Sequence, residues 1–504
     1  MANLSNFIRF HARRTPEAPA MLYQDQSISF SELFERIEKL GGWLVHKGVG
    51  PGDTVIALMK NSAAFVELAF AASHVGAVFL PINFRLSKDE VSYIVSDAKA
   101  KLVVVDEELA ASAPDGIPVF AVGVAVQRDS RAISAAHRPA PMVPRGPSDL
   151  FRLMYTSGTT DRPKGVMHSY DNFYWKSAAH AISLGLNRNT RLLIAGPLYH
   201  VGAFDLPGMA VLWHGGMIAV QREFEPKSAL SAIEREKLTA GWFAPVMTGM
   251  ILACPERHSF DVSSLEWVIG GGERTPESRI RAFSKYFING RYIDGYGLTE
   301  SCSGDTLMDA GREIEKIGST GRAVAHVEIT IRDEKGKLLE AGNEGEICLR
   351  GPKVTAGYWN DPVKTRNAFF EDGSFRTGDV GYLDDEGFLY LTDRKKDMII
   401  SGGENIASSE VERVIYEMPQ IAECAVLGAP DERWGERPVV FVVLRPGNKI
   451  TADDLVAHCR GKIAGFKIPK EVILRDSLPR NPSGKILKRE LRAELAAARK
   501  NDYP

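Results

Sequence analysis

Small, hydroxyl-bearing residues precede a lysine in segment 155–166, which reads Tyr-Thr-Ser-Gly-Thr-Thr-Asp-Arg-Pro-Lys-Gly-Val. Such residues let the backbone curl so that its N–H groups point toward an anion, and their hydroxyls add donors. Lys164 adds a compact positive charge that suits a phosphate. The loop is therefore a candidate for holding the β- and γ-phosphates of ATP, although a polar surface turn explains its chemistry equally well and it lacks the Walker pattern. Its hydroxyl residues and glycine are Thr156, Ser157, Gly158, Thr159 and Thr160.

A threonine and a glutamate are adjacent in the segment Tyr296-Gly-Leu-Thr-Glu-Ser301. The carboxylate of Glu300 suits Mg²⁺, which proteins usually hold with one or two carboxylates together with phosphate oxygens. Thr299 could contact an α-phosphate. Taken alone, the segment also fits a simple turn with a helix N-cap at Thr299.

Two further segments carry glycines or an acid. The run Gly-Gly-Gly-Glu at 270–273 follows the apolar residues 267–269 and indicates a tightly packed backbone. Segment 374–379 ends in Asp379, whose two oxygens could accept hydrogen bonds from both ribose hydroxyls. An ordinary surface charge is the alternative interpretation of Asp379.

A lysine lies within a frame of prolines and glycine near the end of the chain, where residues 479–485 read Pro-Arg-Asn-Pro-Ser-Gly-Lys. A positioned ammonium at Lys485 could stabilise negative charge that gathers at a phosphorus atom. Without that frame, Lys485 would be interpreted as one of several solvated lysines.

Taken in order, these segments resemble the motifs of the adenylate-forming enzymes: acyl-CoA synthetases, aryl-CoA ligases, peptide-synthetase adenylation domains and firefly-type luciferases. The resemblance spans most of the chain and departs from the usual pattern at Asp161, where the family carries glycine. Within that family, the sequence as a whole looks most similar to bacterial fatty-acid–CoA ligases and hydroxycinnamate (feruloyl or coumaroyl) CoA ligases.

The resemblance implies ATP, Mg²⁺ and CoA as cofactors. It also implies that a carboxylic acid first forms acyl-AMP and pyrophosphate, and then acyl-CoA and AMP. Lys485 would be catalytic together with Glu300, Thr299 and Lys164, and the metal would be held by Glu300 and Thr160. The residues assigned to ATP or AMP are Thr156, Ser157, Gly158, Thr159, Thr160, Gly271, Gly272, Glu273, Asp294, Gly295, Tyr296, Gly297, Thr299, Asp379, Arg394 and Lys485.

The resemblance further implies that a small C-terminal domain rotates between the two half-reactions. The pivot corresponds to Lys396. One state would bring Lys485 to the carboxylate, and the other would bring a glycine-containing loop to the tunnel for the CoA thiol. The tunnel residues are Ser401, Gly402 and Gly403. A rigid turn is the alternative interpretation of this segment.

The acid that is activated is the least defined part of the prediction. The residues expected near the acyl group are His200, Phe204, Val246, Met247, Ser301 and Cys302. They are mostly small or apolar, and no lysine or arginine is evident to pair with a second carboxylate, which favours an apolar acid over a dicarboxylate such as malonate. A fatty acid and an aromatic acid such as ferulate both remain open. His200 could orient the carboxylate, and a packed core histidine is an equal alternative.

Other functions compete with a free-standing CoA ligase. An adenylating enzyme could load a carrier protein in trans. A luciferase-like oxygenase is disfavoured because such chemistry is rare on this scaffold. A non-enzymatic binding protein is disfavoured because Lys485, Glu300, Lys164 and Asp379 are all present.

The predicted strands and helices that position these residues differ from one part of the chain to the next. Strand patterns alternate with helical ones over residues 28–106, which predicts an α/β fold with a largely parallel sheet. A connecting segment (107–149), a second α/β run and a β-rich stretch follow. We expect a large N-terminal domain (1–394) with two α/β sheet subdomains and a β-rich subdomain, and a small mobile α+β C-terminal domain (395–504).

Bulk composition limits the function classes. The 504 residues are too many for one compact core, and the net charge of −2 gives no sign of a nucleic-acid partner. Five cysteines without a close pair or a secretion signal predict a cytoplasmic protein, and no segment predicts a membrane span. A small-molecule carboxylic acid is the expected partner. The oligomeric state stays open, a homodimer included.

Overall fold

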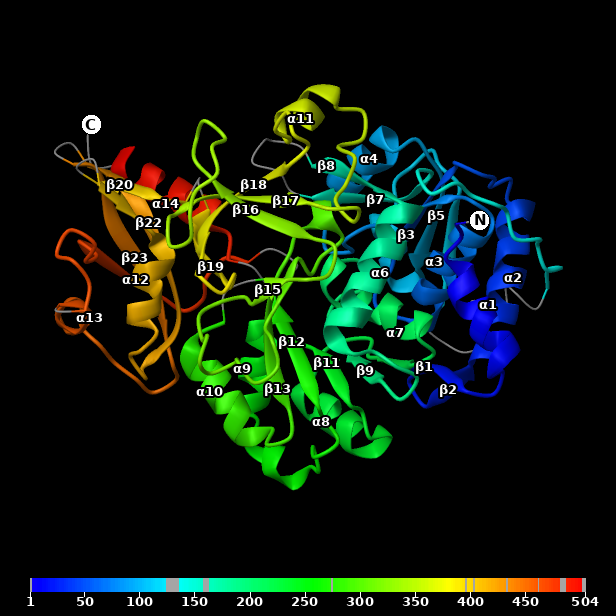
Figure 1. The fold of residues 1–504 in the computed structure, drawn as a ribbon, viewed down its shortest axis with the longest axis horizontal. Coiled ribbons are helices and arrows are strands. Elements are labelled where there is room, and N and C mark those ends of the chain that lie inside the picture. Colours follow the sequence, from blue (N-terminus) through cyan, green and yellow to red (C-terminus); the bar gives the residue numbers. More distant parts are fainter. Residues whose placement is uncertain are drawn as a thin grey trace.

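The computed structural model describes residues 2–123, 136–156, 163–272, 275–394, 397–401, 404–431, 434–460, 462–480 and 486–500. Four β-sheets and their surrounding helices make up this part of the chain (Figure 1). None of its helices is long and apolar enough to cross a membrane.

The first sheet has six strands, all in parallel pairs except the last two. Its order is β6 (Val119–Val122), β5 (Ala100–Asp106), β3 (Thr54–Leu58), β4 (Val78–Pro81), β7 (Leu150–Thr156) and β8 (Lys164–Ser169). Every residue of β3 is buried, because helices cover both faces. Alternate residues of β3 pack toward α3 (Ala63–His74) on one face and α4 (Lys88–Asp97) on the other.

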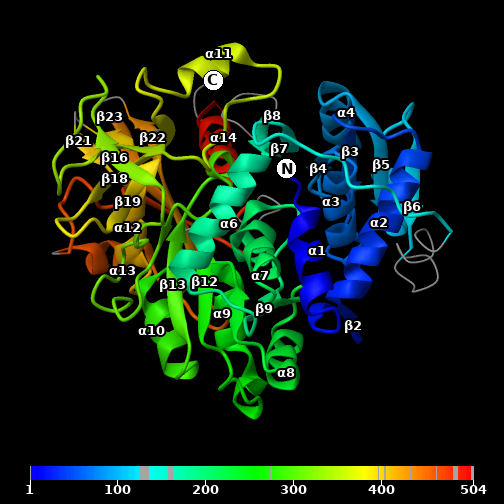
Figure 2. The same cartoon turned by 45° about the vertical axis from the view of Figure 1, so that its right-hand side comes forward.

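The second sheet has nine strands, and the first two strands of the chain form one of its edges. Its order is β15 (Arg322–Ala323), β14 (Thr306–Leu307), β13 (Arg291–Tyr296), β12 (Trp267–Gly271), β11 (Ala240–Trp242), β9 (Arg191–Ile194), β10 (Met217–Val220), β1 (Pro19–Tyr23) and β2 (Gln26–Ser29). One continuous core joins this sheet to the first through α1 (Ser5–Arg14), α2 (Phe30–His46), α3, α6 (Tyr170–Leu184) and α7 (Met209–Trp213). Figure 2 shows α6 and α7 between the two sheets. The opposite face is covered by α8 (Pro226–Glu236), α9 (Pro245–Ala253) and α10 (Glu277–Tyr286).

Two smaller sheets complete the fold. The third is antiparallel, with β16 (Glu328–Arg332), β17 (Gly345–Arg350), β18 (Phe375–Leu383) and β19 (Leu389–Arg394), and α11 (Pro362–Asn367) lies between β17 and β18 in sequence. The fourth contains β21 (Glu404–Ile406), β20 (Ile399–Ser401), β23 (Gly435–Leu444), β22 (Ile421–Asp431) and β24 (Glu471–Arg475). One face packs on α12 (Ser408–Ile415) and α13 (Ala452–Cys459), and the other packs on α14 (Lys488–Lys500).

The predicted fold class is confirmed: several α/β and β sheets form a large N-terminal part, and a small α+β unit follows. Two details differ from the sequence prediction. The segment 107–149 is not only a connector, because β6 adds an edge strand to the first sheet. The second predicted α/β run also divides, since β7 and β8 join the first sheet and the later strands form the second.

Candidate active site

A glycine-lined backbone surface lies where β12 and β13 end side by side. The two parallel strands place Gly270 opposite Asp294 and Gly271 opposite Gly295. A Cβ atom added to Gly270 would lie 1.8 Å from the phenol oxygen of Tyr292. One added to Gly297 would lie 2.2 Å from the backbone nitrogen of Gly304. These close approaches explain why both positions are glycine, because a side chain at either one would collide with packed protein atoms.

Tyr296 and Asp379 meet across two sheets. The Tyr296 phenol, at the end of β13, donates to Asp379 Oδ2 on β18 at 2.8 Å, and both side chains are buried. Burial, together with the nearby Asp379 carboxylate, raises the pKa of Tyr296 well above its usual value, so the phenol stays protonated and donates. The backbone N–H of Asp379 donates to Thr377 Oγ1 at 3.0 Å, which fixes the strand here. The predicted adenine and ribose residues are therefore neighbours.

Lys164, Glu300 and Tyr358 form a second polar cluster. Lys164 Nζ lies 2.9 Å from Glu300 Oε1 and donates to the Tyr358 phenol oxygen at 2.7 Å. The Tyr358 phenol donates in turn to the same carboxylate at 2.9 Å. Burial, with Glu300 nearby, raises the pKa of Tyr358, so it acts as a donor. The cluster therefore holds a carboxylate and an ammonium together at the start of β8.

The turn that carries Thr299 and Glu300 is held by a buried histidine. His168 Nε2 lies 2.7 Å from the carbonyl oxygen of Thr299, and Arg152 Nε donates to His168 Nδ1 at 3.1 Å. Burial strongly lowers the pKa of His168, and the Arg152 charge adds to this effect. The imidazole is neutral, and because Nδ1 accepts from arginine, Nε2 carries the proton and donates to Thr299.

Residues predicted for the acyl pocket fall into two groups. Phe204 and Cys302 are fully buried in the core between the two large sheets, and Met247 packs on the separate core beneath α8–α10. The backbone N–H of Gly202 donates to His200 Nδ1 at 3.3 Å, so this histidine caps the helical turn Val201–Gly208. Val246 lies beside Met247 at the start of α9.

Lys353 Nζ donates to the main-chain carbonyls of Ser301 and Ser303, so a buried cation lies beside Cys302. Lys176, Arg152 and Lys353 are buried, and their charges act on the Cys302 thiol. Their positions on α6, on β7 and after β17 are far from Cys302 in the sequence, so the motifs gave no signal that they would meet it.

Comparisons with known proteins decide the family. A model described as AMP-binding enzyme matches residues 8–359, and one described as AMP-binding enzyme C-terminal domain matches residues 410–485. The chain belongs to the family of AMP-binding enzymes. A feruloyl-CoA synthase of Amycolatopsis sp is 37% identical over 482 residues, which cover 95% of this chain and 96% of the relative.

Two further AMP-binding relatives match nearly the whole chain. A long-chain-fatty-acid–CoA ligase of Mycobacterium tuberculosis is 35% identical over 507 residues, covering 99% of each chain. The structure of o-succinylbenzoate CoA synthetase from Bacillus subtilis, in complex with the acyl-adenylate intermediate OSB-AMP, superposes with a TM-score of 0.86 at 30% identity. That match covers 97% of this chain and 98% of the other.

Membership of the AMP-binding family makes this chain an acid–thiol ligase with ATP, Mg²⁺ and CoA as cofactors. The described residues fit these groups. Glu300 offers a carboxylate of the kind that Mg²⁺ prefers, and Lys164 beside it offers a cation that suits a phosphate. Thr156 ends β7 with a buried hydroxyl that has no partner among the described residues, which suits a ligand oxygen.

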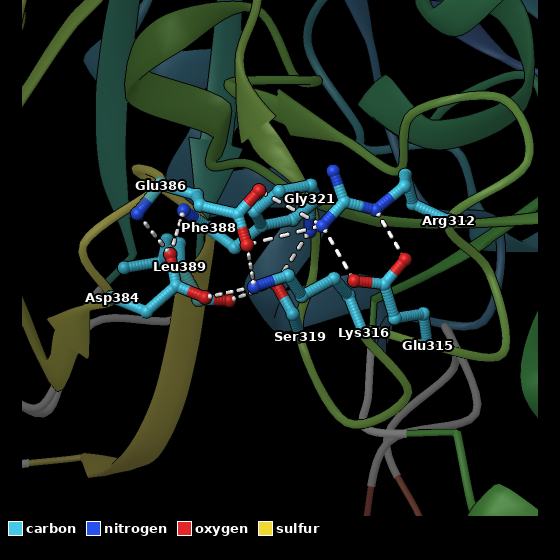
Figure 3. A network of polar contacts seen from close by, with 9 residues as sticks. All are labelled: Arg312, Glu315, Lys316, Ser319, Gly321, Asp384, Glu386, Phe388 and Leu389. Atoms are coloured by element: carbon cyan, nitrogen blue, oxygen red, sulfur yellow. Dashed lines mark hydrogen bonds and ion pairs between the residues drawn. The ribbon is translucent and has the colours of Figure 1, made fainter.

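A charged network joins the segment after β14 to the turn between β18 and β19 in this AMP-binding enzyme (Figure 3). We call it the clamp: Arg312 and Lys316, which follow β14, with Asp384 and Glu386 in the β18–β19 turn. Arg312 Nη2 lies 2.9 Å from Glu386 Oε2, and Lys316 Nζ lies 2.9 Å from Asp384 Oδ2. The clamp ties the hairpin that carries Asp379 to the segment beside β13.

Several predicted residues lie outside the described part of the chain or outside its described side chains. They are Ser157, Gly158, Thr159, Thr160, Asp161, Glu273, Lys396, Gly402, Gly403 and Lys485, together with the side chain of Arg394. The backbone of Arg394 pairs with Asp379 across β18 and β19, and Ser401 ends β20.

Tyr358 is the site residue that the sequence reasoning missed. It lies outside every motif considered, and a tyrosine between a glycine and a tryptophan carries no chemical signature of its own. Its backbone neighbour Trp359 donates an N–H to the carbonyl of Gly165 at 2.7 Å, which brings the phenol to Lys164.

Proposed function

We propose that this enzyme activates a carboxylic acid with ATP and then transfers the acyl group to the thiol of CoA. The observation that carries the proposal is the Lys164–Glu300 ion pair, 2.9 Å long, because Glu300 lies in the turn that follows Tyr296 and Tyr296 donates to Asp379. Such a site offers a cation for phosphates, a carboxylate for Mg²⁺ and an acceptor for ribose hydroxyls.

The residue roles in the proposal follow from this arrangement. Tyr296 would stack on the base, Asp379 would accept from the ribose, and Glu300 would hold Mg²⁺ against the phosphates. Lys164 would contact the phosphates, whose negative charge can replace that of Glu300 as the partner of its ammonium. Lys485 stabilises the negative charge that develops at the α-phosphorus as the acid attacks and pyrophosphate leaves.

The second step depends on a change of domain orientation. We place the boundary between residues 394 and 395 and the pivot at Lys396, so that 395–504 move as one body over 1–394. Ser401, Gly402 and Gly403 would then line the path of the CoA thiol, which attacks the acyl carbonyl and displaces AMP. Five free cysteines, all buried, fit a reaction in the reducing cytoplasm.

The substrate proposed is an acid with a largely apolar body, either a fatty acid or an aromatic acid of the hydroxycinnamic type. Phe204 and Cys302 supply a buried, mainly apolar surface. The relatives carry names for a feruloyl, a long-chain fatty and an o-succinylbenzoate substrate, which supports the CoA-ligase class across different acids.

A panel of acids tests the proposal. The enzyme would be incubated with ATP, Mg²⁺ and CoA together with acetate, octanoate, palmitate, benzoate, coumarate, ferulate or malonate, and AMP and thioester would be quantified. We expect AMP and thioester in equal amounts with at least one acid. Acid-dependent AMP release that requires a phosphopantetheinyl carrier protein instead of CoA would favour carrier loading, and no thioester with any acid would contradict the proposal.

A further inference from the structure

The chain takes an unusual conformation in the turn that follows Glu300. Cys302, Ser303 and Gly304 have φ values of 56°, 67° and 61°, so three consecutive residues lie in the left-handed region. Glycine alone enters this region without a steric cost, and left-handed residues normally occur singly. Cys302 and Ser303 are both buried, so contacts with the surrounding protein must stabilise this backbone. We call residues 302–304 the left-handed turn.

One buried ammonium collects carbonyl oxygens of the left-handed turn. Lys353 Nζ donates to the main-chain carbonyls of Ser301 and Ser303, at 2.7 and 2.8 Å. It also donates to Asp305 Oδ1 at 2.6 Å, so three acceptors match its three N–H groups. The other carboxylate oxygen of Asp305 accepts from the Ser301 hydroxyl. Lys353 therefore neutralises Asp305 and, at the same time, satisfies two carbonyls that the left-handed turn brings together.

Neighbouring backbone encloses the left-handed turn. A Cβ atom added to Gly304 would lie 2.6 Å from His180 Nε2, and one added to Gly297 would lie 2.2 Å from the Gly304 nitrogen. The N–H of Asp305 donates to the carbonyl of Tyr296 at 2.7 Å. A small shift of the turn would therefore reach the backbone that precedes Glu300, because there is no free space to absorb it.

The segment that carries Lys353 also holds Glu300. The N–H of Thr355 donates to the main-chain carbonyl of Glu300 at 2.7 Å, and the Tyr358 phenol donates to its carboxylate at 2.9 Å. Cys302, a residue predicted for the acyl pocket, lies in the left-handed turn itself. The backbone between the phosphate site and the acyl pocket is thus held from one side by a single segment of the chain.

We propose that Lys353 is a positioning residue for acyl-adenylate formation. Its ammonium stabilises the left-handed turn and thereby aligns the Glu300 carboxylate with the wall of the acyl pocket at Cys302. The inference rests on the proposed CoA-ligase function and adds to it a residue that acts through the backbone. Neutralising Asp305 is the alternative role of Lys353, because an unpaired buried carboxylate is costly whatever the turn does.

The double variant K353M/D305N separates these two roles, because it removes both charges and leaves no buried charge unpaired. Acid-dependent pyrophosphate exchange is measured with the acid that gives the most thioester. We expect kcat to fall about 30-fold and KM for ATP to change less than about threefold, because Tyr296 and Asp379 keep their hydrogen bond. A wild-type kcat would overturn the inference. No exchange by the wild type with any acid would instead contradict the ligase function.

A glycine at position 303 tests the left-handed turn directly. Glycine adopts a φ of 67° without a steric cost, so adding S303G to K353M/D305N should raise kcat again at least about tenfold. A loss that S303G does not reverse would overturn the inference. If the double variant does not fold, the triple variant still decides. A folded triple variant that exchanges pyrophosphate supports the role of the turn, and one that also fails to fold contradicts it.

The matched control is R36M/E67Q, which removes another buried ion pair. Arg36 Nη1 lies 3.0 Å from Glu67 Oε1 and joins α2 to α3, with side chains that are 8% and 0% exposed, against 1% and 0% for Lys353 and Asp305. We expect the control to lower the melting temperature and to keep the wild-type kcat. A loss of kcat in the control as large as that in K353M/D305N would show that buried ion pairs act here only through stability, and would contradict the positioning role.

Discussion

Tyr358 links the two charged side chains of the proposed phosphate site, Lys164 and Glu300. Its phenol contacts both Lys164 and Glu300, so it holds the carboxylate in place whether or not the lysine is paired with it. The direct ion pair has side chains that are only partly exposed, 24% for Lys164 and 11% for Glu300, and it is therefore weakly screened by salt. In the proposed mechanism, Tyr358 is a positioning residue for the Glu300 carboxylate.

The variant Y358F tests this role. Removing the phenol deletes a hydrogen bond to a charged group, and we expect kcat/KM for ATP to fall roughly tenfold in a pyrophosphate-exchange assay. The Mg²⁺ concentration that gives half-maximal activity should rise as well, because Glu300 is less well oriented. The control is Y390F, whose ring stacks on Tyr382 away from this cluster. Unchanged ATP and Mg²⁺ dependence in Y358F would contradict the assignment.

Lys176 also gives a pH-dependent stability. Its pKa is lowered from about 10.5 to about 8 in the folded enzyme, by burial against the weaker opposing effect of Asp205 and the Cys302 thiol, with Arg152 and Lys353 adding repulsion. Between these two values the unfolded chain binds more protons than the folded one, so stability due to this residue rises with pH. We expect the melting temperature of the wild type minus that of K176M to increase from pH 7 to pH 10, measured calorimetrically without substrate. A constant difference would show that burial does not lower the pKa of Lys176.

The sequence identifies residues whose chemistry is local to a motif, and it misses those that depend on packing. Glu300 and Asp379 stand out because a carboxylate follows a recognisable backbone pattern. Tyr358 reaches Lys164 and Glu300 only because the chain returns to β8 after β17, and its neighbourhood has no local pattern. Long-range contacts of this kind cannot be inferred from residue spacing.

At the scale of elements, the clamp determines how the third sheet approaches the second. Lys316 reaches both Asp384 at 2.9 Å and Glu386 at 2.5 Å, and Leu389 donates its N–H to the carbonyl of Gly321 at 2.8 Å. The hydrogen bond from Lys316, and next to it the one from Arg312, lowers the pKa of Glu386. Single exposed ion pairs contribute little, but a network anchored by backbone hydrogen bonds can hold a hairpin in position.

The double variant R312A/K316A should loosen that hairpin. We expect KM for ATP to rise roughly two- to fivefold at low ionic strength, because Asp379 is held less closely to Tyr296, and the difference from the wild type to shrink in 1 M salt, where exposed charges are screened. The control R235A/K237A removes the ion pairs to Glu236 and Asp261, which lie outside the clamp. A KM that stays at the wild-type value would show that the clamp is irrelevant to nucleotide binding.

Element types were more predictable than their partners. Strand and helix patterns are predicted to alternate over residues 28–106, and the helix Phe30–His46 and the strand Thr54–Leu58 form within that range. The sheet to which a strand belongs does not follow, because β1 and β2 cross to the second sheet while β7 and β8 stay with the first. Strand pairing depends on the global burial of both sheet faces, which one strand's own pattern does not contain.

At the scale of the whole molecule, ion pairs join the segments around the fourth sheet to one another, and a hydrogen bond joins this unit to the third sheet. Asp397 pairs with Arg492 of α14 at 2.6 Å, and Glu412 of α12 pairs with Lys488 at 2.8 Å. Ser409 donates to the carbonyl of Thr392 in β19. Internally bonded units joined by a short segment suit a hinge, since few contacts must break when one unit turns.

Two variants separate the half-reactions that this hinge would divide. K485A should abolish acid-dependent pyrophosphate exchange, because the ammonium that stabilises charge at the α-phosphorus is lost, yet it should still form thioester from supplied acyl-AMP and CoA. K396P should do the reverse, since proline fixes φ and blocks the turn that exposes the CoA path. Both steps are assayed separately, with K470A, an exposed lysine of the same unit, as control. Normal pyrophosphate exchange in K485A would contradict the catalytic assignment, and unimpaired thioester formation in K396P would contradict the hinge.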